Sequence, residues 1–280
     1  MQELAVRSNF DKVFEAFGVR VRLESDRPEL LEVGMEVAST ALIKRLEIIE
    51  NRTEPVDHTF GVYRNSEGKL YFTNEGKPVR AFEKEIYFRR NLNSMVRLHV
   101  AEKARNWVFI HAGVVGWRGF AIILPAMSHN GKTTLVSELI RLGADYYSDE
   151  YAVIDTSGLV HPFERDLSVR PPGSEIPIQV PPAEFGASIG SEPLPVGMVL
   201  LTKFESGAVF TPENQSVGIG IMETVPNVIP IRLNTDFSLK VLNTAFRRAI
   251  IIKSLRGEAQ IAARSILSYF DDNFDLANKD

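Results

Sequence analysis

The residues with the clearest chemical potential form one short run between an apolar segment and an amphipathic one: Leu124-Pro125-Ala126-Met127-Ser128-His129-Asn130-Gly131-Lys132-Thr133-Thr134. Its end, Gly131-Lys132-Thr133, matches the end of the phosphate-binding pattern G-x-x-x-x-G-K-[ST]. Ala126 stands where that pattern has its first glycine. In such a loop, successive backbone N–H groups and a helix N-terminus converge on phosphate oxygens. The run therefore predicts binding of a nucleoside triphosphate with Mg²⁺.

Each position of this loop has a predicted role. The ammonium of Lys132 would neutralise the β- and γ-phosphates, and the hydroxyl of Thr133 would ligate Mg²⁺. The remaining positions would line the nucleotide, namely Ala126, Met127, Ser128, His129, Asn130, Gly131 and Thr134. Alanine at a positive φ carries a steric cost, so Ala126 can serve only in a backbone region open to L-residues. An ordinary strand-turn-helix with a capping threonine is the alternative.

Two neighbouring acids follow the loop after one helix and one turn, in Ser148-Asp149-Glu150. A strand that follows the helix would return beside the loop in a right-handed crossover. Asp149 or Glu150 would then bind Mg²⁺ directly or through water. The other acid would accept the proton of a hydroxyl nucleophile. The alternative is a solvated acidic turn before a strand.

His111 precedes the loop on a predicted β-hairpin. A tight turn centred between Trp117 and Arg118 would place His111 opposite Leu124, next to the loop. There the imidazole could polarise a phosphate oxygen or hydrogen-bond an acid. A buried histidine in the core of the strand fits the same pattern. His58 shows no evident partner in the sequence.

Four predicted elements position these groups. Strands are expected over 107–115, 119–124 and 151–155, and a helix over 132–142. The apolar face of that helix consists of Leu135, Val136, Leu139, Ile140 and Leu142. Gly143 is expected to end the helix, as a glycine at the C-terminal cap does.

The flanking regions predict a mixed α/β protein. Downstream, a Pro- and Gly-rich loop is expected over 170–197, strands over 197–202 and 208–210, and a helical pattern over 236–274 with a break at Gly257. Upstream, strands are expected over 19–23, 59–63 and 70–73 and helices over 28–49 and 83–104. The predicted domains are an N-terminal α/β unit, 1–95, and a core with C-terminal helices, 96–280.

Composition excludes several classes of function. The chain has 280 residues, a net charge of −4 and no cysteine. A surface that tracks nucleic acid needs a basic excess, which is missing here. Cysteine-ligated zinc, thiolate catalysis and disulfides are excluded. The apolar runs are strand-length, far short of the roughly 20 residues that span a bilayer. These features predict a cytoplasmic protein that binds neither nucleic acid nor membrane.

Three segments together resemble the HPr kinase/phosphorylase family. They are Ile110-His111-Ala112-Gly113-Val114-Val115, the loop that ends in Gly131-Lys132-Thr133-Thr134, and Tyr147-Ser148-Asp149-Glu150-Tyr151-Ala152-Val153. The resemblance implies a P-loop core of the type shared with phosphoenolpyruvate carboxykinases. It also implies ATP- and Mg²⁺-dependent phosphorylation of a serine hydroxyl. By this resemblance Asp149 is the catalytic base, Glu150 its acidic companion, and His111 a residue on the phosphate side.

The sequence departs from this family at three places, one of which is Glu150 where the family has a second aspartate. Ala126-Met127-Ser128-His129-Asn130 replaces the usual glycine-rich loop, and Ile229-Pro230-Ile231-Arg232-Leu233-Asn234 only faintly resembles the family's Arg-Pro-Gly-containing loop. The expected phosphate acceptor is therefore a peptide, a protein or a small hydroxyl compound. Ala126 also keeps open a nucleotide-binding regulatory module without phosphotransfer. A carboxykinase activity lacks a convincing His/Lys/Asp set for Mn²⁺, and a homo-oligomer is compatible with the sequence.

Overall fold

The computed structural model describes residues 8–43, 45–50, 54–125, 131–171, 174 and 177–277, with side chains to 274. It has two compact units, Met1–Asn106 and Trp107–Asp280. The boundary predicted between 95 and 96 falls inside the helix α2 (Glu85–Lys103), and the units divide after this helix instead. The physical reason is that α2 packs along its length on the first unit, against α1, β5 and β6.

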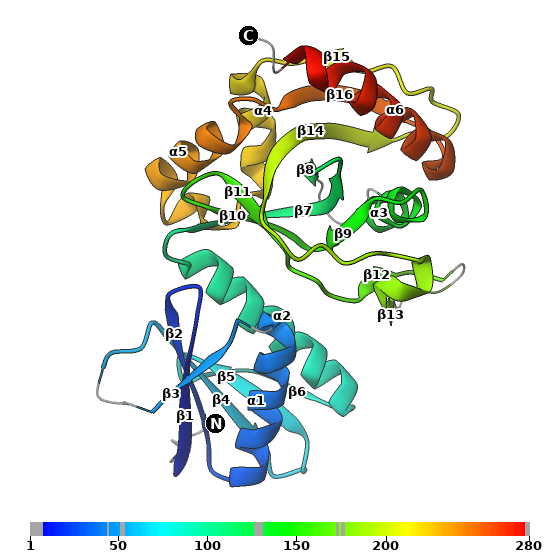
Figure 1. Ribbon diagram of the computed structural model, residues 1–280. Helices are drawn as coiled ribbons and strands as arrows, with labels where there is room; N and C mark the ends of the chain where they lie inside the picture. The colour runs from blue at the N-terminus through cyan, green and yellow to red at the C-terminus, as the bar shows by residue number, and fades with distance from the viewer. Residues whose placement is uncertain are drawn as a thin grey trace. The chain divides into compact units, whose positions relative to one another are not determined.

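The first unit is a sheet with two helices, drawn in blue to cyan in Figure 1. The strand order is β3-β1-β2-β4-β5-β6. Neighbouring strands are antiparallel except β2 and β4, which are parallel and are connected through α1. The bounds are β1 (Phe10–Ala16), β2 (Val19–Ser25), α1 (Pro28–Leu42), β3 (Glu47–Ile49), β4 (His58–Arg64), β5 (Leu70–Asn74) and β6 (Lys77–Phe82).

Alternation along the strands explains this packing. In β2 every second residue is buried, as expected for a strand with one face on the core. The strands predicted over 19–23, 59–63 and 70–73 are confirmed, and so is the helix predicted over 83–104. The helix predicted over 28–49 was too long. It ends at Leu42, because Ile43 adopts φ 39 and the chain then pairs β3 with β1.

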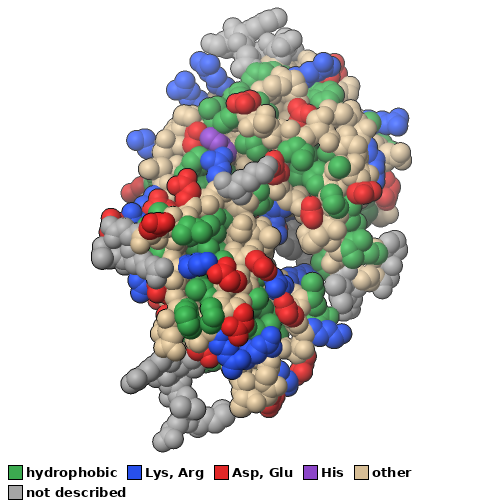
Figure 2. Space-filling model, turned by 60° about the horizontal axis from the view of Figure 1, so that its bottom comes forward, with side chains coloured by type: hydrophobic (Ala, Val, Ile, Leu, Met, Phe, Trp, Pro, Cys, Tyr) green, Lys and Arg blue, Asp and Glu red, His purple; other side chains and the backbone are tan. Residues whose placement is uncertain are grey.

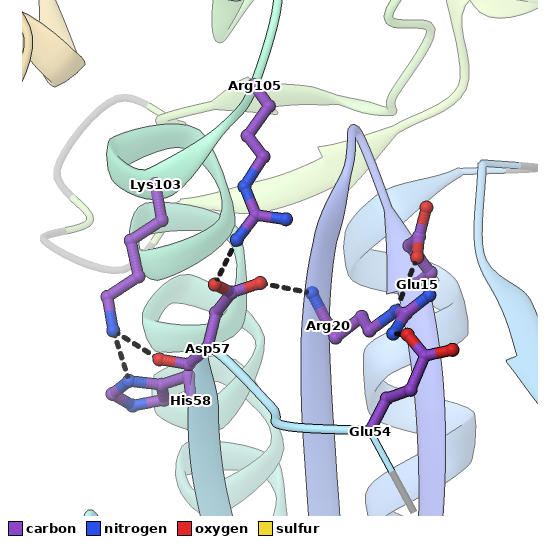
Figure 3. A network of polar contacts seen from close by, with 7 residues as sticks. All are labelled: Glu15, Arg20, Glu54, Asp57, His58, Lys103 and Arg105. Carbon is purple, nitrogen blue, oxygen red and sulfur yellow. Dashed lines mark hydrogen bonds and ion pairs between the residues drawn. The ribbon is translucent and has the colours of Figure 1, made fainter. Parts of the chain in front are cut away.

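Asp57 connects three segments of the first unit (Figure 3). Its carboxylate accepts from Arg105 Nη2 at 2.6 Å and from the backbone N–H of Arg20 at 2.9 Å. Its carbonyl oxygen accepts from Lys103 Nζ at 2.5 Å. The Arg20 guanidinium continues the network to Glu15 at 2.9 Å. These contacts hold the C-terminal end of α2 against Asp57, the residue that directly precedes β4.

His58 lies beside this network and is only 4% exposed. Its Nδ1 lies 2.9 Å from Glu75 Oε1 and 3.3 Å from Lys103 Nζ. The sequence pattern indicates no partner for His58, and the fold brings these two residues to it. Its ring centroid lies 4.2 Å from that of His99. Burial lowers the pKa of His58 to about 4, His99 and Lys103 lower it as well, and Glu75 raises it. His58 is therefore neutral at pH 7.

The free energy of unfolding of the first unit is expected to fall on acidification. The pKa of His58 is about 4 in the fold and 6.5 as its ordinary value, so the unfolded chain binds the proton more readily. This contribution is complete above about pH 6.5 and disappears as the pH falls towards about 4. It amounts to roughly 3 kcal/mol at most.

Urea unfolding at several pH values tests this expectation. Both tryptophans, Trp107 and Trp117, lie in the second unit, so far-UV circular dichroism would follow both units and tryptophan fluorescence only the second. The transition whose pH dependence comes from His58 should appear in the circular dichroism alone. It should flatten in His58→Gln, and an equal pH slope in this variant and the wild type would contradict the expectation.

The second unit is built on a mixed sheet of order β11-β10-β7-β8-β14-β16-β15, with β9 also paired to β7. The strands β8, β14 and β16 run parallel to one another. The strand bounds are β7 (Trp107–Trp117), β8 (Phe120–Pro125), β9 (Asp145–Ser148), β10 (Tyr151–Asp155), β11 (Leu159–His161), β14 (Leu194–Phe204), β15 (Glu213–Asn214) and β16 (Ile250–Arg256). A separate pair is formed by β12 (Leu167–Val169) and β13 (Ile178–Val180).

Helices cover both faces of this sheet. They are α3 (Lys132–Arg141), α4 (Val217–Thr224), α5 (Thr235–Phe246) and α6 (Ala259–Ala277), with short 3-10 turns at Pro182–Phe185, Val225–Asn227 and Ile229–Arg232. Ile122 and Leu124 of β8 belong to the core under α3 and α6, whereas Ile123 belongs to the core under α5. Sheets buried on both faces read as continuous apolar runs. The second unit is therefore a three-layer α/β arrangement, with α3 and α6 opposite α4 and α5 (Figure 1).

The C-terminal prediction was partly wrong. The helical pattern predicted over 236–274 consists of α5, the strand β16 and α6. The β-branched run Ile250-Ile251-Ile252 enters the sheet beside β14, a distant partner that periodicity along the chain does not reveal. The segment 208–210 is not a strand, and the loop predicted over 170–197 contains β13 and a 3-10 turn within its described residues.

The described surface carries charges of both signs. On the face in Figure 2, Lys and Arg side chains are interspersed with Asp and Glu, and neither sign forms a continuous field there. Of the helices the structure describes, none combines the length and the apolar character needed to cross a bilayer.

Candidate functional site

The candidate site is built around the middle of β7, the strand between β8 and the β9–β10 segment. Tyr151 pairs with His111 and Ser148 with Val114, so the end of β9 and the start of β10 share one register along β7, which shifts only farther back in β9. Asp149 and Glu150, which lie between Ser148 and Tyr151, therefore fall opposite Gly113 and Ala112, respectively. The backbone N–H of Ala112 donates to the Glu150 carbonyl at 3.2 Å. This register places Asp149 opposite Gly113.

The hairpin of β7 and β8 has a different register from the predicted one. Trp117 pairs with Phe120 and Gly113 with Leu124, so His111 is not opposite Leu124 as predicted. The turn is Arg118-Gly119, and both residues have positive φ, 54 and 82. Such a two-residue turn matches the twist of the strands. The slip amounts to two residues, so His111 keeps the predicted face of the sheet.

Gly113 lets the first turn of α3 approach β7. A Cβ on Gly113 would lie 2.6 Å from Val136 Cγ2 and 3.2 Å from Lys132 Cγ. A larger residue here would push α3 off the sheet. His111 and Gly113 are two residues apart on a strand, so their side chains share one face. The glycine therefore brings Lys132 to the face on which His111 lies.

Lys132 and His111 meet at this position. Lys132 Nζ lies 3.2 Å from His111 Nε2. A protonated lysine can only donate, so Nε2 accepts and the proton of a neutral ring is on Nδ1. Burial lowers the pKa of Lys132, and the charges of Asp149 and Glu150 act in the opposite direction. The structure thus brings together two of the three predicted catalytic residues.

Asp149 and Thr133 form the second contact of the site. The Thr133 hydroxyl donates to Asp149 Oδ2 at 2.9 Å, and the backbone N–H of Ser168 donates to the same oxygen at 3.3 Å. Asp149 is 7% exposed. Its second oxygen, Oδ1, is buried with no hydrogen-bond partner among the described residues. Such an orphaned oxygen costs free energy unless a ligand satisfies it.

Burial is the main electrostatic influence on Asp149. It raises the pKa of this carboxyl to about 6, against the lowering effects of Lys132, the Thr133 hydroxyl and the Ser168 N–H. The nearby charge of Glu150 raises the pKa further. A buried carboxylate with a raised pKa beside a polar cluster is a common feature of functional sites. Asp149 is thereby suited to accept a proton near neutral pH.

Gly131 and Arg256 fix the start of α3. Gly131 is the N-cap and adopts φ 69, a left-handed conformation that favours glycine. Arg256, at the end of β16, is 2% exposed and donates from Nη2 to the Gly131 carbonyl at 3.0 Å. The helix N-terminus is thus held to the end of a parallel strand.

The other predicted positions have separate outcomes. Ala126, Met127, Ser128, His129 and Asn130 lie outside the described residues. Thr134 is exposed, and its carbonyl accepts from the Ser137 hydroxyl at 2.9 Å. Glu150 is half-buried opposite Ala112, close enough for its charge to affect Lys132 and Asp149.

The residues present fit a magnesium nucleotide. In the part of the chain that the structure describes, no three His, Cys, Asp or Glu side chains converge as a metal cage. Mg²⁺ is commonly bound by one or two carboxylates, waters and the oxygens of substrate phosphates. Thr133 would supply one such oxygen, and one of the two acids would supply another, either Asp149 through its orphaned Oδ1 or Glu150. The other acid would accept a proton. Lys132 would contact phosphate.

Three residues of the site were not identified from the sequence, namely Gly113, Arg256 and Ser168. Gly113 was noted only as part of a family-like segment, although a glycine inside a strand signals close approach of another backbone. Arg256 was hidden in a segment interpreted as helical. Ser168 acts through its backbone N–H, which leaves no signal in residue type.

Comparison with known proteins gives no family model that matches the sequence and no curated protein that matches it significantly.

Proposed function

We propose that this protein is an ATP- and Mg²⁺-dependent kinase that transfers the γ-phosphate to a serine-type hydroxyl of a peptide, a protein or a small molecule. The observation that carries the proposal is the pair of contacts at the first turn of α3, Thr133 to Asp149 and Lys132 to His111. They join a hydroxyl, a buried carboxylate and a cation where a helix N-terminus can receive phosphate.

The arrangement of the second unit supports the same proposal. An apolar strand, β8, leads into the predicted loop, and the amphipathic helix α3 leads out of it. Asp149 follows on the next segment of chain, directly after β9, and its carboxylate accepts a hydrogen bond from Thr133 of that helix. A P-loop core of the HPr kinase type, suggested by the three family-like segments, is part of the proposal.

The side chains have distinct roles in the transfer. When bound, the nucleotide supplies the phosphoryl group and the leaving ADP. Asp149 would accept the proton of the acceptor hydroxyl at a carboxylate oxygen. The hydroxyl oxygen would bond to the γ-phosphorus while the bond from that phosphorus to the leaving ADP oxygen breaks. Lys132 and the backbone N–H groups at the start of α3 hold phosphate oxygens, and His111 positions Lys132. Such chemistry rests on positioning and electrostatics, for which few groups suffice.

Binding of ATP is the first test. Calorimetry with and without Mg²⁺ is expected to show micromolar binding to the wild type. Lys132→Ala should bind roughly 10- to 100-fold more weakly, the equivalent of a hydrogen bond to a charged group. Lys240→Ala, which removes an exposed lysine on α5, is the matched control and should bind as the wild type does. If the wild type binds neither ATP, GTP nor pyrophosphate, the proposal fails.

A further inference from the structure

A cavity of about 260 Å³ lies where the parallel strands β14 and β16 end. Part of its wall is the chain that follows β14, and part is the junction between β16 and α6. It is lined by Gly207, Ala208, Val209, Phe210, Gly257, Glu258, Ile261, Ala262 and Ser265. The catalytic assignment given above uses none of these residues.

The cavity is connected to the start of α3 through one side chain. Arg256 directly precedes Gly257 of the cavity wall, and its guanidinium donates to the Gly131 carbonyl at 3.0 Å. The Arg256 carbonyl accepts from the backbone N–H of Glu205 at 2.9 Å, which ties the end of β16 to the end of β14. Since β8, β14 and β16 are parallel, all three end at one edge of the sheet. In α/β proteins, ligands commonly bind beyond the carboxyl ends of the parallel strands.

The lining of the cavity suits a flat heterocycle. Val209 is 75% exposed and Ile261 is 70% exposed, and both apolar side chains line this one cavity. Phe210 adds an aromatic ring, and Glu258 adds a carboxylate that can accept from an amino group. Gly257 keeps the wall thin, because a Cβ there would lie 2.5 Å from the Ala208 carbonyl. The volume is below the roughly 300–1,000 Å³ of pockets for whole ligands, so it suits a fragment of one.

We propose that this cavity binds the adenine base of the nucleotide whose phosphates lie at Gly131–Thr133, an inference that rests on the proposed kinase function. Val209, Phe210 and Ile261 would cover the faces of the ring. Glu258 would accept a hydrogen bond from the exocyclic amino group. Arg256 keeps the base and phosphate subsites at a fixed separation, because it contacts Gly131 and borders the cavity.

Inorganic tripolyphosphate separates the two subsites, since it has the phosphates and lacks the base. By calorimetry with Mg²⁺, the wild type is expected to bind ATP at least tenfold more tightly than tripolyphosphate. Ile261→Gln should weaken ATP binding about tenfold and leave tripolyphosphate binding unchanged. Met222→Gln is the matched control, because Met222 is 67% exposed on α4 and does not line the cavity. Both positions are exposed, so both variants are expected to fold.

The outcomes distinguish this inference from the proposed function. Equal affinity of the wild type for ATP and tripolyphosphate would overturn the base site and leave the phosphate site standing. Unchanged ATP binding in both Ile261→Gln and Val209→Gln would also overturn it. Absence of binding to either compound would overturn the proposed function and this inference together. Tighter binding of GTP than of ATP would retain the cavity as a base site and overturn its assignment to adenine.

Discussion

Asp149→Asn is expected to reduce the rate of phosphoryl transfer by roughly 10²- to 10⁴-fold, the usual contribution of a general base. The amide keeps the shape of the side chain and can still accept from Thr133 and Ser168 through its oxygen. It no longer accepts the proton of the acceptor hydroxyl. ATP binding without Mg²⁺ is expected to change little, because Lys132 and the start of α3 remain. The measurement is the release of phosphate from γ-labelled ATP, with water as the acceptor, alongside calorimetry.

Asp145→Asn is the matched control for this experiment. Asp145 begins β9, the strand that ends just before Asp149, and it is exposed. This variant should keep the wild-type rate. A full rate in Asp149→Asn would remove Asp149 from the role of base. A wild type that binds ATP without releasing phosphate or labelling any acceptor would favour the nucleotide-binding regulatory module.

Phe270→Ala is expected to lower the free energy of unfolding of the second unit by about 3–5 kcal/mol, the range for removing a buried aromatic ring. Phe270 is 1% exposed on α6, and its ring centroid lies 4.7 Å from that of Phe274. It packs over Gly197 of β14, where a Cβ would lie 2.8 Å from its ring. Alanine at this position would therefore leave a cavity between α6 and β14 and remove the packing contact between them.

Tryptophan fluorescence during urea unfolding measures this effect, because both tryptophans belong to the second unit. Ser268→Ala, an exposed position on the same helix, should leave the transition in place. The acid-sensitive transition of the first unit should be unaffected by Phe270→Ala. A loss below about 1 kcal/mol, the mean for substitutions of all kinds, would show that α6 does not depend on this ring.

Local chemistry determined those parts of the protein that depend on neighbours in the chain. The helix after the loop, with Gly143 at its end, follows from apolar spacing and a glycine that tolerates φ 97. The strands at Val19, Thr59 and Leu70 follow from alternation and from turn residues between them. Gly131, Lys132 and Thr133 stand out in the sequence because they match the end of the phosphate-loop pattern. The pair Asp149-Glu150 stands out only together with that loop, because it follows the loop after one helix and one turn.

The tertiary structure alone decided which distant residues meet. β16 joins the sheet because β14 offers a parallel partner, and helical spacing within 236–274 does not show this. The hairpin register depends on the backbone angles of Arg118 and Gly119. Arg256 reaches Gly131 across a large separation in sequence, and Asp149 meets Thr133 only because Gly113 admits the helix. The spacing of apolar residues shows which face of a helix or strand is buried. The contacts above depend instead on the register between strands and on how closely a helix approaches a strand.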